Sequence, residues 1–509
     1  MKHPSILCLF FILLASCQSL PPLENRSRSR YIEAPHAARV YNTLHKKNRP
    51  EQTRKADLSG IYLLNDPHDA FVARATLIQS AEQALDIQYY IWHNDVSGRL
   101  LMQMVKDAAN RGVRVRILLD DNNTRGMDDI LVALDRHPNI EIRLFNPFTS
   151  RSMRSLGYLY DFPRLNRRMH NKTLTADNKA TILGGRNIGD EYFNIANDVG
   201  FADLDILATG SVVNDVSSDF DRYWASESSY PLASIVKHAY PENGRAALDR
   251  VSEKDRELRE AYRNTLKTSR LYQAISSKNI PWIYAPTQYI SDDPAKGLDR
   301  SKNKPLIIEK IDEALGTPEK ELYIVSPYFV PTKEGVEALT ELRQNQIGIT
   351  VLTNSLQATD VAAVHSGYAR YRKKLLQAGI KLYELKATHS VPKITDKGLV
   401  GSSSSLHAKI FIVDRERVFI GSFNFDPRSA RLNTEMGVVI EDAKLAERMQ
   451  KTLDDSAPRQ AYQVTLGSDN RLRWQDPENN LVSKHEPTAK FWKRLISNLF
   501  SIMPIERLL

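Results

Sequence analysis

Cysteine is almost absent from this sequence of 509 residues, which has two of them, Cys8 and Cys17. So few cysteines exclude a disulfide framework as the basis of the fold. Long apolar runs are also scarce, and the run from Ser5 to Leu14 is too short to cross a bilayer. Negative charge is in the minority, and the net charge is +9. A basic balance suits an anionic partner, either a nucleic acid or an acidic lipid surface, and does not distinguish between them.

The first seventeen residues have the features of a targeting segment. Lys2 supplies a positive charge, the apolar run follows, and Leu14-Ala15-Ser16-Cys17 resembles a bacterial lipobox. We therefore expect residues 1–17 to be a lipoprotein-type signal peptide, with cleavage before Cys17 and lipidation of that residue. An ordinary signal peptide and an uncleaved anchor are the alternatives. Lipidation would place the protein in the bacterial cell envelope, anchored to a membrane and facing the periplasm.

Two polar segments flank the central part of the chain. Residues 18–57 are basic and lack a core-forming period, so we expect a polar tether between the anchor and the folded part of the chain. Residues 466–509 form a tail that ends in a predicted amphipathic helix. Such a helix could lie in a membrane interface or dock on the protein's own core. Its apolar stripe consists of Phe491, Trp492, Leu495, Ile496, Leu499, Phe500 and Met503.

The chain contains one pattern twice, in residues 169–198 and 406–435. Each copy has a histidine, a lysine two residues later, an aspartate, two small residues, an asparagine and finally an acid. Every position of the second copy lies 237 residues after its counterpart. The candidate site residues of the first copy are His170, Lys172, Asp177, Asn187 and Asp198. Those of the second copy are His407, Lys409, Asp414, Ser422, Asn424 and Glu435.

This spacing suits chemistry at a phosphate. A histidine and a lysine two residues apart point to the same face of a strand, and a hairpin return would bring the asparagine back beside them. Lysine, amide and backbone N–H groups are donors for phosphate oxygens. Two such sets facing each other would place one histidine on either side of a phosphorus atom, one as nucleophile and one as proton donor. A carboxylate such as Glu435 or Asp198 could hold each imidazole in the required tautomer.

A single copy of this motif is weak evidence, because three fixed residues often arise by chance on a solvated strand end. Two complete copies at one offset are specific. They resemble the phospholipase D superfamily over about residues 60–465. The stretch DIQYYIWHND, followed by SGRLLMQMVKDAANRGVRVRILLDD, looks most similar to bacterial cardiolipin synthases of the C-type. Members of this superfamily act on lipids or on nucleic acids, so the motif alone does not fix the substrate.

The resemblance implies a covalent phosphohistidine intermediate and no metal or other cofactor. By resemblance His170 is the nucleophile, and His407 is then the residue that protonates the departing alcohol. Lys172, Lys409, Asn187 and Asn424 would bind phosphate oxygens. Asp177 and Asp414 are expected to give structural support rather than to transfer protons. These residue numbers are all positions of the motif copies given above.

At this length the chain is expected to form two or more domains. Strand, helix and strand alternate before each motif, which favours an α/β fold with helices on the faces of a sheet. We predict two similar phospholipase D-like βαβ-sandwich halves, residues 58–285 and 286–465, packed about a pseudo-twofold axis with a single active site between them. Tyr89, Tyr90 and Trp92 could line that site, although core packing is the expected role for most of them.

The predicted function is phosphatidyl transfer on membrane phospholipids, and the specific reaction that we expect is cardiolipin synthesis. The expected partners are phosphatidylglycerol, phosphatidylethanolamine and a membrane surface, and an accessory protein is left open. Hydrolysis to phosphatidic acid is the alternative, because water can replace the acceptor alcohol. A nuclease using the same site is a second alternative, disfavoured by the lipobox and by the C-terminal helix pattern.

Overall fold

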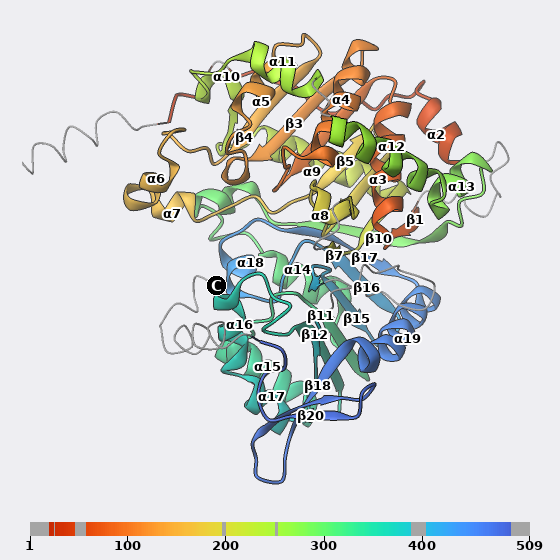
Figure 1. Cartoon of the computed structure of the whole chain (residues 1–509), viewed down its shortest axis with the longest axis vertical. Coiled ribbons are helices and arrows are strands. Elements are labelled where there is room, and N and C mark those ends of the chain that lie inside the picture. Colours follow the sequence, from red (N-terminus) through yellow and green to blue (C-terminus); the bar gives the residue numbers. More distant parts are fainter. Residues whose placement is uncertain are drawn as a thin grey trace, which may run out of the picture.

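The computed structural model describes residues 20–24, 26–45, 57–195, 200–249, 253–387 and 404–489. The described chain forms two halves that lie one above the other along the long axis, and each half is a mixed sheet with helices against it (Figure 1). The two sheets repeat the same strand plan. The α/β fold with two similar halves that the sequence predicts is therefore confirmed.

The sheet of the first half is mixed. β2, β3 and β4 are parallel, because α4 (Val96–Asn110) and α5 (Asp128–Asp135) connect them as crossover helices. All other neighbours in this sheet are antiparallel. In spatial order its strands are β1 (Leu58–Leu64), β8 (Asp205–Gly210), β6 (Ala180–Gly184), β5 (Thr173–Ala176), β2 (Ala84–Tyr89), β3 (Arg114–Asp120), β4 (Ile140–Phe145) and β9 (Ser229–Pro231).

The sheet of the second half repeats this order and extends it by two strands. β11, β12 and β13 are the parallel strands here. In spatial order the strands are β10 (Ile283–Ser291), β17 (Met436–Glu441), β16 (Arg417–Gly421), β15 (Ile410–Val413), β11 (Glu321–Val325), β12 (Gly348–Asn354), β13 (Lys381–Leu385), β18 (Ala461–Leu466), β19 (Leu472–Asp476) and β20 (Leu481–Ser483).

Strand β10 joins the two halves. Its first residues pair with β1 of the first sheet, and its last residues pair with β17 of the second. The predicted boundary between residues 285 and 286 therefore falls inside a strand rather than in a linker. A buried apolar cluster crosses the same junction and contains Ile61, Leu183 and Ile206 from the first half with Ile410, Ile420 and Val438 from the second.

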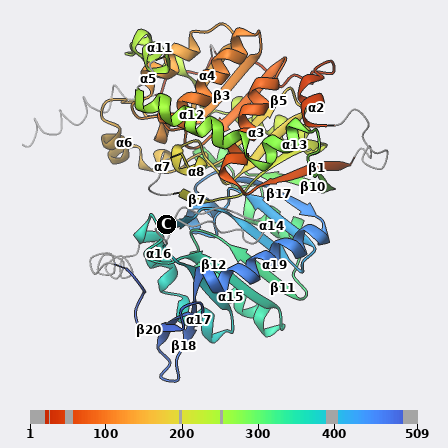
Figure 2. The ribbon, with the colours of Figure 1, turned by 45° about the vertical axis from the view of Figure 1, so that its right-hand side comes forward.

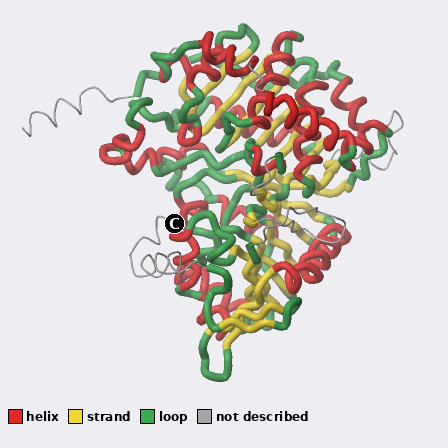
Figure 3. The backbone as a smooth tube through the Cα atoms, viewed as in Figure 1, coloured by secondary structure: helices red, strands yellow, loops and turns green. Residues whose placement is uncertain are grey.

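Helices lie against both sheets, as the red segments of Figure 3 show. The longer ones are α3 (Pro67–Ser80), α9 (Val212–Trp224), α11 (Pro241–Asp249), α12 (Glu253–Lys267), α14 (Ile307–Leu315), α15 (Thr332–Gln344) and α19 (Ala443–Gln460). The shorter ones are α2 (Arg39–Leu44), α6 (Arg154–Tyr160), α7 (Phe162–Leu165), α8 (Asp190–Phe193), α10 (Leu232–Ile235), α13 (Arg270–Ser276), α16 (Ala362–Ala369), α17 (Arg372–Gln377) and α18 (Pro427–Arg431), with 3₁₀ turns η2 (Asp121–Asn123) and η3 (Pro294–Leu298).

The N-terminal segment is not a free tether where the structure describes it. Residues 26–31 lie along the first half, where the backbone carbonyls of Ser27 and Ser29 accept hydrogen bonds from Arg143 and Arg116 at 2.7 and 3.0 Å. Helix α2 follows and buries Val40 and Leu44 in the core. The prediction of a tether is therefore wrong over residues 26–45. The apolar residues of this segment are spaced too irregularly to predict a helix of the core, yet they pack on the core of the first half. We call residues 20–45 the strap.

The boundary predicted at residue 465 is also wrong. β19 and β20 continue the second sheet after β18, so residues 466–483 belong to the second half. Alternation is weak in these short, half-exposed strands, and polarity alone suggested a tail. The predicted amphipathic helix lies in residues 490–509, outside the described residues. In the parts of the chain that the structure describes, no helix is both long enough and apolar enough to span a membrane.

Candidate active site

Each motif is built on a β-hairpin, β5–β6 in the first half and β15–β16 in the second. Each hairpin has a three-residue loop, 177–179 in the first half and 414–416 in the second, and its first two residues, Asp177 and Asn178 or Asp414 and Arg415, are at positive φ. The Asp177 carboxylate accepts three backbone N–H groups of residues 82–84 at 2.8 Å. Asp414 does the same for residues 319–321. Both aspartates tie the hairpin to the neighbouring strand and lie one strand length from the histidines, in keeping with the support role expected of them.

The other end of each hairpin meets the opposite half. The backbone N–H of His170 donates to Thr434 O at 2.9 Å, and that of His407 donates to Ala202 O at 2.8 Å. The short parallel pair β7 (Gly200–Ala202) and β14 (Ser404–Leu406) makes the second of these junctions. The two histidines are thus held at the interface between the halves, with both of their peptide segments bonded across it.

The carboxylates that contact the imidazoles also come from the opposite half. His170 Nδ1 lies 2.7 Å from Glu435 Oε2, and His407 Nδ1 lies 2.6 Å from Asp203 Oδ2. Both carboxylates are buried. A carboxylate at Nδ1 fixes the tautomer with the proton on Nδ1 and leaves the Nε2 lone pair free to react. The expected orienting role of Glu435 thus has a geometric basis, and it acts across the interface.

Asp203 is the site residue that the sequence reasoning missed. Gly421 lies 237 residues after Gly184, whereas Glu435 lies only 232 residues after Asp203. The ladders show why, since Gly184 pairs with Asp205 and Gly421 pairs with Gly437. The first half carries five extra residues between its asparagine and its acid, so a constant offset selects Asp198 instead. Asp198 lies outside the described residues, and the carboxylate on His407 is Asp203.

Burial and positive charge lower the pKa of both imidazoles. Burial lowers the pKa of His170 well below its ordinary value, and Lys172 and Lys409 lower it further. Burial and Lys409 also lower the pKa of His407, against an opposing effect of Asp203. Each lysine Nζ donates to the backbone carbonyl of its own histidine, at 2.5 Å for Lys172. Burial lowers the pKa of Lys172 to about 7. These are donors ready for an anionic group between the histidines.

The two carboxylates differ in charge. His407 and Lys409 outweigh burial and hold the pKa of Asp203 below its ordinary value. Burial instead raises the pKa of Glu435 to about 7, although Lys172 opposes it. Ser422 Oγ donates to Glu435 Oε2 at 2.5 Å. Its counterpart Gly185 cannot carry a side chain, because a Cβ there would lie 2.2 Å from Asp203 Oδ1. Ser422 therefore supports Glu435, which refines the substrate-binding role expected of it.

The two motif asparagines are held differently. Asn187 accepts the Ile91 N–H at 3.2 Å and donates to the Tyr192 hydroxyl at 2.9 Å. Asn424 is buried, and among the described residues its Oδ1 has no hydrogen-bond partner. The two asparagines therefore differ at the side-chain oxygen, which accepts a hydrogen bond in Asn187 and has no partner among the described residues in Asn424.

Aromatic rings border both histidines. The ring centroid of Tyr90 lies 4.9 Å from that of His170, edge to face. Tyr192 and Phe201 lie 5.5 and 5.2 Å from His407. Tyr89 and Trp92 pack in the core of the first half instead, as expected for most of that aromatic stretch. Tyr90 alone of the three residues reaches the site.

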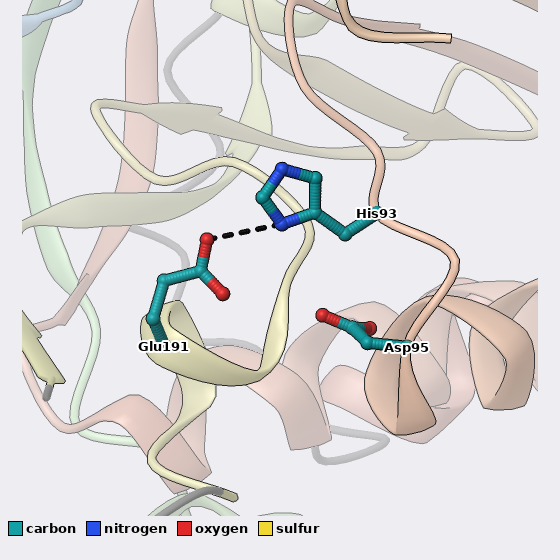
Figure 4. A group of neighbouring side chains, drawn as sticks. All are labelled: His93, Asp95 and Glu191. Atoms are coloured by element: carbon teal, nitrogen blue, oxygen red, sulfur yellow. Dashed lines mark ion pairs between the residues drawn. The ribbon is translucent and has the colours of Figure 1, made fainter. Parts of the chain in front are cut away.

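His93, Asp95 and Glu191 form a second group of polar side chains near the site (Figure 4). Their ligand atoms lie within 4.8 Å of one another, a composition that could hold a cation. Their contacts have another explanation. His93 Nδ1 pairs with Glu191 Oε1 at 3.1 Å, and Asp95 accepts the N–H groups of Gly98 and Asp190 at 2.9 and 2.7 Å. The group is an ion pair beside the N-cap of α4.

Two buried imidazoles whose Nδ1 atoms contact carboxylates, two lysines and two amides at one interface define a phosphodiester-transferring enzyme of the phospholipase D type. Comparison with known proteins agrees. A family model described as "Cardiolipin synthase, PLD-like domain" matches residues 75–224 and 307–456, one match in each half.

Two relatives and one solved structure place the chain more closely. It is 48 % identical to cardiolipin synthase C of Escherichia coli K12 over 463 residues, which cover 88 % of this chain and 96 % of the relative. It is 24 % identical to a cardiolipin synthase of Oceanobacillus iheyensis over 452 residues, covering 88 % and 79 %. A phosphatidylserine synthase structure from Haemophilus influenzae has the same fold, with a TM-score of 0.58, 13 % identity and coverage of 93 % of this chain and 100 % of that one. The chain belongs to the cardiolipin synthase family with phospholipase D-like domains and is a phospholipase D-type phosphatidyltransferase.

Proposed function

We propose that this protein synthesises cardiolipin by transferring a phosphatidyl group between phospholipids through a phosphohistidine intermediate. In the first step His170 Nε2 attacks the phosphorus of the donor phospholipid, and His407 gives a proton to the departing headgroup alcohol. In the second step His407 takes the proton of an acceptor hydroxyl, whose oxygen attacks phosphorus and releases His170. With phosphatidylglycerol as acceptor the product is cardiolipin, and phosphatidylethanolamine can serve as donor.

The observation that carries this proposal is the pair of imidazole–carboxylate contacts that cross the interface, at 2.7 and 2.6 Å. The difference between them supports the assignment of roles. Beside an ionised Asp203, His407 can become an imidazolium, as a residue that donates and accepts protons must. His170 is pushed further toward the neutral form, as a nucleophile must be. Lys172, Lys409, Asn187 and Asn424 would bind the phosphate oxygens.

The setting of the protein supports a lipid substrate over a nucleic acid. The relative with 48 % identity over most of both chains is a cardiolipin synthase. The lipobox at Cys17 would anchor the mature chain in the cell envelope, facing the periplasm, where phospholipid is available as donor and acceptor. The net charge of +9 suits a surface of anionic lipid.

Mass spectrometry of lipids from cells that lack cardiolipin tests the proposal. Cells expressing the wild-type chain should regain cardiolipin, and cells expressing His170→Ala or His407→Ala should not. Asp215→Asn, a change at an exposed carboxylate of α9, is a matched control that should retain the product. Phosphatidic acid without cardiolipin would establish hydrolysis instead. Unchanged lipids together with a nuclease activity that falls steeply with salt would establish the nuclease.

A trapping experiment tests the intermediate. Purified wild-type protein mixed briefly with donor phospholipid and then denatured should carry a phosphatidyl group on His170, located by peptide mass spectrometry. A modification on His407 instead would exchange the two roles. No modification at either histidine, in a preparation that makes cardiolipin, would contradict a covalent route.

A further inference from the structure

Exposed apolar side chains gather on one small part of the surface. Of the ten large hydrophobic residues that are exposed among the described residues, five lie on α6 and α7 or directly before them. Leu159 is 82 % exposed, and each of the others is at least 40 % exposed. We call these five residues, Met153, Leu156, Leu159, Tyr160 and Phe162, the α6–α7 patch.

The orientation of α6 is fixed by its opposite face. Arg154 donates to the Asp121 carbonyl at 2.7 Å, and Tyr158 donates to Asn122 Oδ1 at 2.9 Å. Gly157 is buried against Leu165, and a Cβ at residue 157 would lie 2.9 Å from its Cδ1. Polar anchors and a close approach thus hold one face of the helix on the protein. These contacts turn the apolar face of α6 outward. The exposed apolar residues are therefore not the result of loose packing of a core helix.

The α6–α7 patch adjoins the active site. Tyr158 binds Asn122 of η2, and the next residue, Asn123, donates to the Tyr90 carbonyl at 3.3 Å. The Tyr90 ring borders His170 at 4.9 Å. On the other side, Asn166 directly after α7 accepts a hydrogen bond from Arg428 of α18 at 2.6 Å. The patch therefore lies beside the junction of the halves, where the substrate phosphate must enter.

The start of the described chain lies on the same side. Leu20, three residues after Cys17, packs on the first-half core, and three residues span at most about 11 Å. Arg26 of the strap donates to the Ser229 carbonyl at 3.3 Å, and Ser229 pairs with Phe145 of β4. Two residues further on, the carbonyl of Pro147 accepts a hydrogen bond from Arg164 of α7 at 3.0 Å, so the strap and α7 lie against the same end of β4. Figures 1 and 2 both show α6 and α7 at the edge of the first half where the strap begins.

We propose that the α6–α7 patch docks into the interface of an anionic phospholipid bilayer and holds the active site at the level of the headgroups. This inference rests on the proposed function, because it supplies that site with substrate. Lipidation at Cys17 would keep the strap within a few residues of the bilayer, which fits docking of the neighbouring patch. Tyr160 and Phe162 are the residue types that membrane interfaces favour, and the net charge of +9 complements anionic lipid.

Fluorescence of variants that each carry one added cysteine tests the docking. Leu159→Cys in the full chain is labelled with a polarity-sensitive dye and mixed with vesicles of phosphatidylglycerol and phosphatidylethanolamine. Leu481→Cys, at an exposed leucine of β20, is the matched control, and the parent chain measures labelling at Cys17. Nitroxides on the lipid chains should quench the dye at residue 159 and spare the dye at 481. Equal quenching at both positions would overturn the proposal.

An activity measurement separates docking from chemistry. The double variant Leu156→Asp/Leu159→Asp should lose about 100-fold of the transfer rate on vesicles, since each buried leucine contributes roughly a factor of ten in binding. It should keep its rate on dispersed short-chain phospholipid. Leu481→Asp/Val482→Asp should match the wild type on both substrates. Equal losses on both substrates, or a dimer in solution that shields the dye at residue 159 without lipid, would overturn the proposal.

The two proposals can fail separately. If the dye at residue 159 enters the bilayer and the wild-type chain transfers no phosphatidyl group, the docking surface stands and the proposed function falls. His170→Ala is expected to remove transfer and to leave the quenching at residue 159 unchanged, because the patch contacts lipid without the reacting group. A loss of quenching in His170→Ala would show that the dye reports on substrate turnover, against the proposal.

Discussion

At the scale of single residues, His170 and His407 are equivalent in sequence and differ in their surroundings. Each imidazole contacts one buried carboxylate, yet Asp203 is ionised while burial raises the pKa of Glu435 to about 7. The serine hydroxyl of Ser422 serves Glu435, and Gly185 leaves the same space to Asp203. One fold repeat thus gives two histidines suited to different steps.

Asp203→Asn is the substitution that tests the reassigned carboxylate. It should lower kcat by about 100-fold or more with a smaller change in KM, because His407 would lose the group that fixes its tautomer and stabilises its protonated form. Steady-state kinetics on a defined lipid substrate measure this, with Asp215→Asn as the surface control. A larger loss in Asp198→Asn than in Asp203→Asn would instead restore the residue that the constant offset selects.

Glu435 predicts a dependence of stability on pH. Its pKa is raised from 4.5 to about 7 in the folded chain, so its contribution is fully present below pH 4.5 and is lost as pH rises through about 7. The loss is about 3 kcal/mol of unfolding free energy. The Glu435→Gln variant has no ionisable group at this position and should not show this loss of unfolding free energy as the pH rises. Melting temperatures of both proteins at pH 5 and pH 8 measure this. From pH 5 to pH 8 the melting temperature of the wild type should fall relative to that of the variant, and an equal difference between the two proteins at both pH values would contradict the raised pKa of Glu435.

At the scale of elements, tertiary packing gives the strap a defined structure that its sequence pattern does not predict. Residues 18–57 are rich in charge and lack a helical or strand period, which predicted a tether. Yet Arg116 and Arg143, both buried, use their guanidinium groups to bind strap carbonyls, and α2 fills a place in the first-half core. Arg116 and Arg143 are 87 and 116 residues away from the carbonyl groups that they bind, so no local window contains both partners.

Leu44→Ala tests whether the strap is part of the fold. Leu44 is buried in the core, so the change should cost about 2–5 kcal/mol of unfolding free energy and lower the melting temperature by several degrees. Leu481→Ala, the same change at an exposed position of β20, should have little effect. Thermal unfolding followed by circular dichroism measures both. Identical melting temperatures for the two variants would support a free tether after all.

At the scale of the whole molecule, the active site belongs to neither half. Strand β10 pairs with both sheets, a shared apolar cluster crosses the junction, and each histidine takes its carboxylate from the other half. A half separated from the other would expose that cluster and leave its histidine without a partner carboxylate. Fusion of both copies in one chain keeps the site assembled at any protein concentration.

The single intramolecular site predicts no complementation between inactive chains. Purified His170→Ala and His407→Ala proteins, mixed in equal amounts, should remain as inactive as each alone, because exchange of halves would require breaking the β1–β10 pairing and the shared core. Cardiolipin formation by the mixture is the readout, and the wild-type protein at the same total concentration is the control. Activity in the mixture would show that halves swap between chains.

The sequence by itself determined the repeat and the residue types of the candidate site. Spacing along a strand and a hairpin is a local property, so two copies of one motif were enough to predict an α/β fold in two halves and a site with two histidines, two lysines and two asparagines. The supporting role of Asp177 and Asp414 stays a prediction, and each of the two carboxylates accepts three backbone N–H groups.

Only the tertiary structure decided which groups meet. Asp203 is the carboxylate that contacts a histidine because the connection between two strands is five residues longer in the first half than in the second. The extra residues change which positions pair in the sheet and leave the motif itself unchanged. Contacts between residues distant in the chain decide three further features. They are the carboxylate that each histidine receives from the other half, the packing of the strap and the outward face of α6. Burial and charge then set the pKa values, because the free energy of an ionised group depends on what surrounds it and not on its neighbours in sequence.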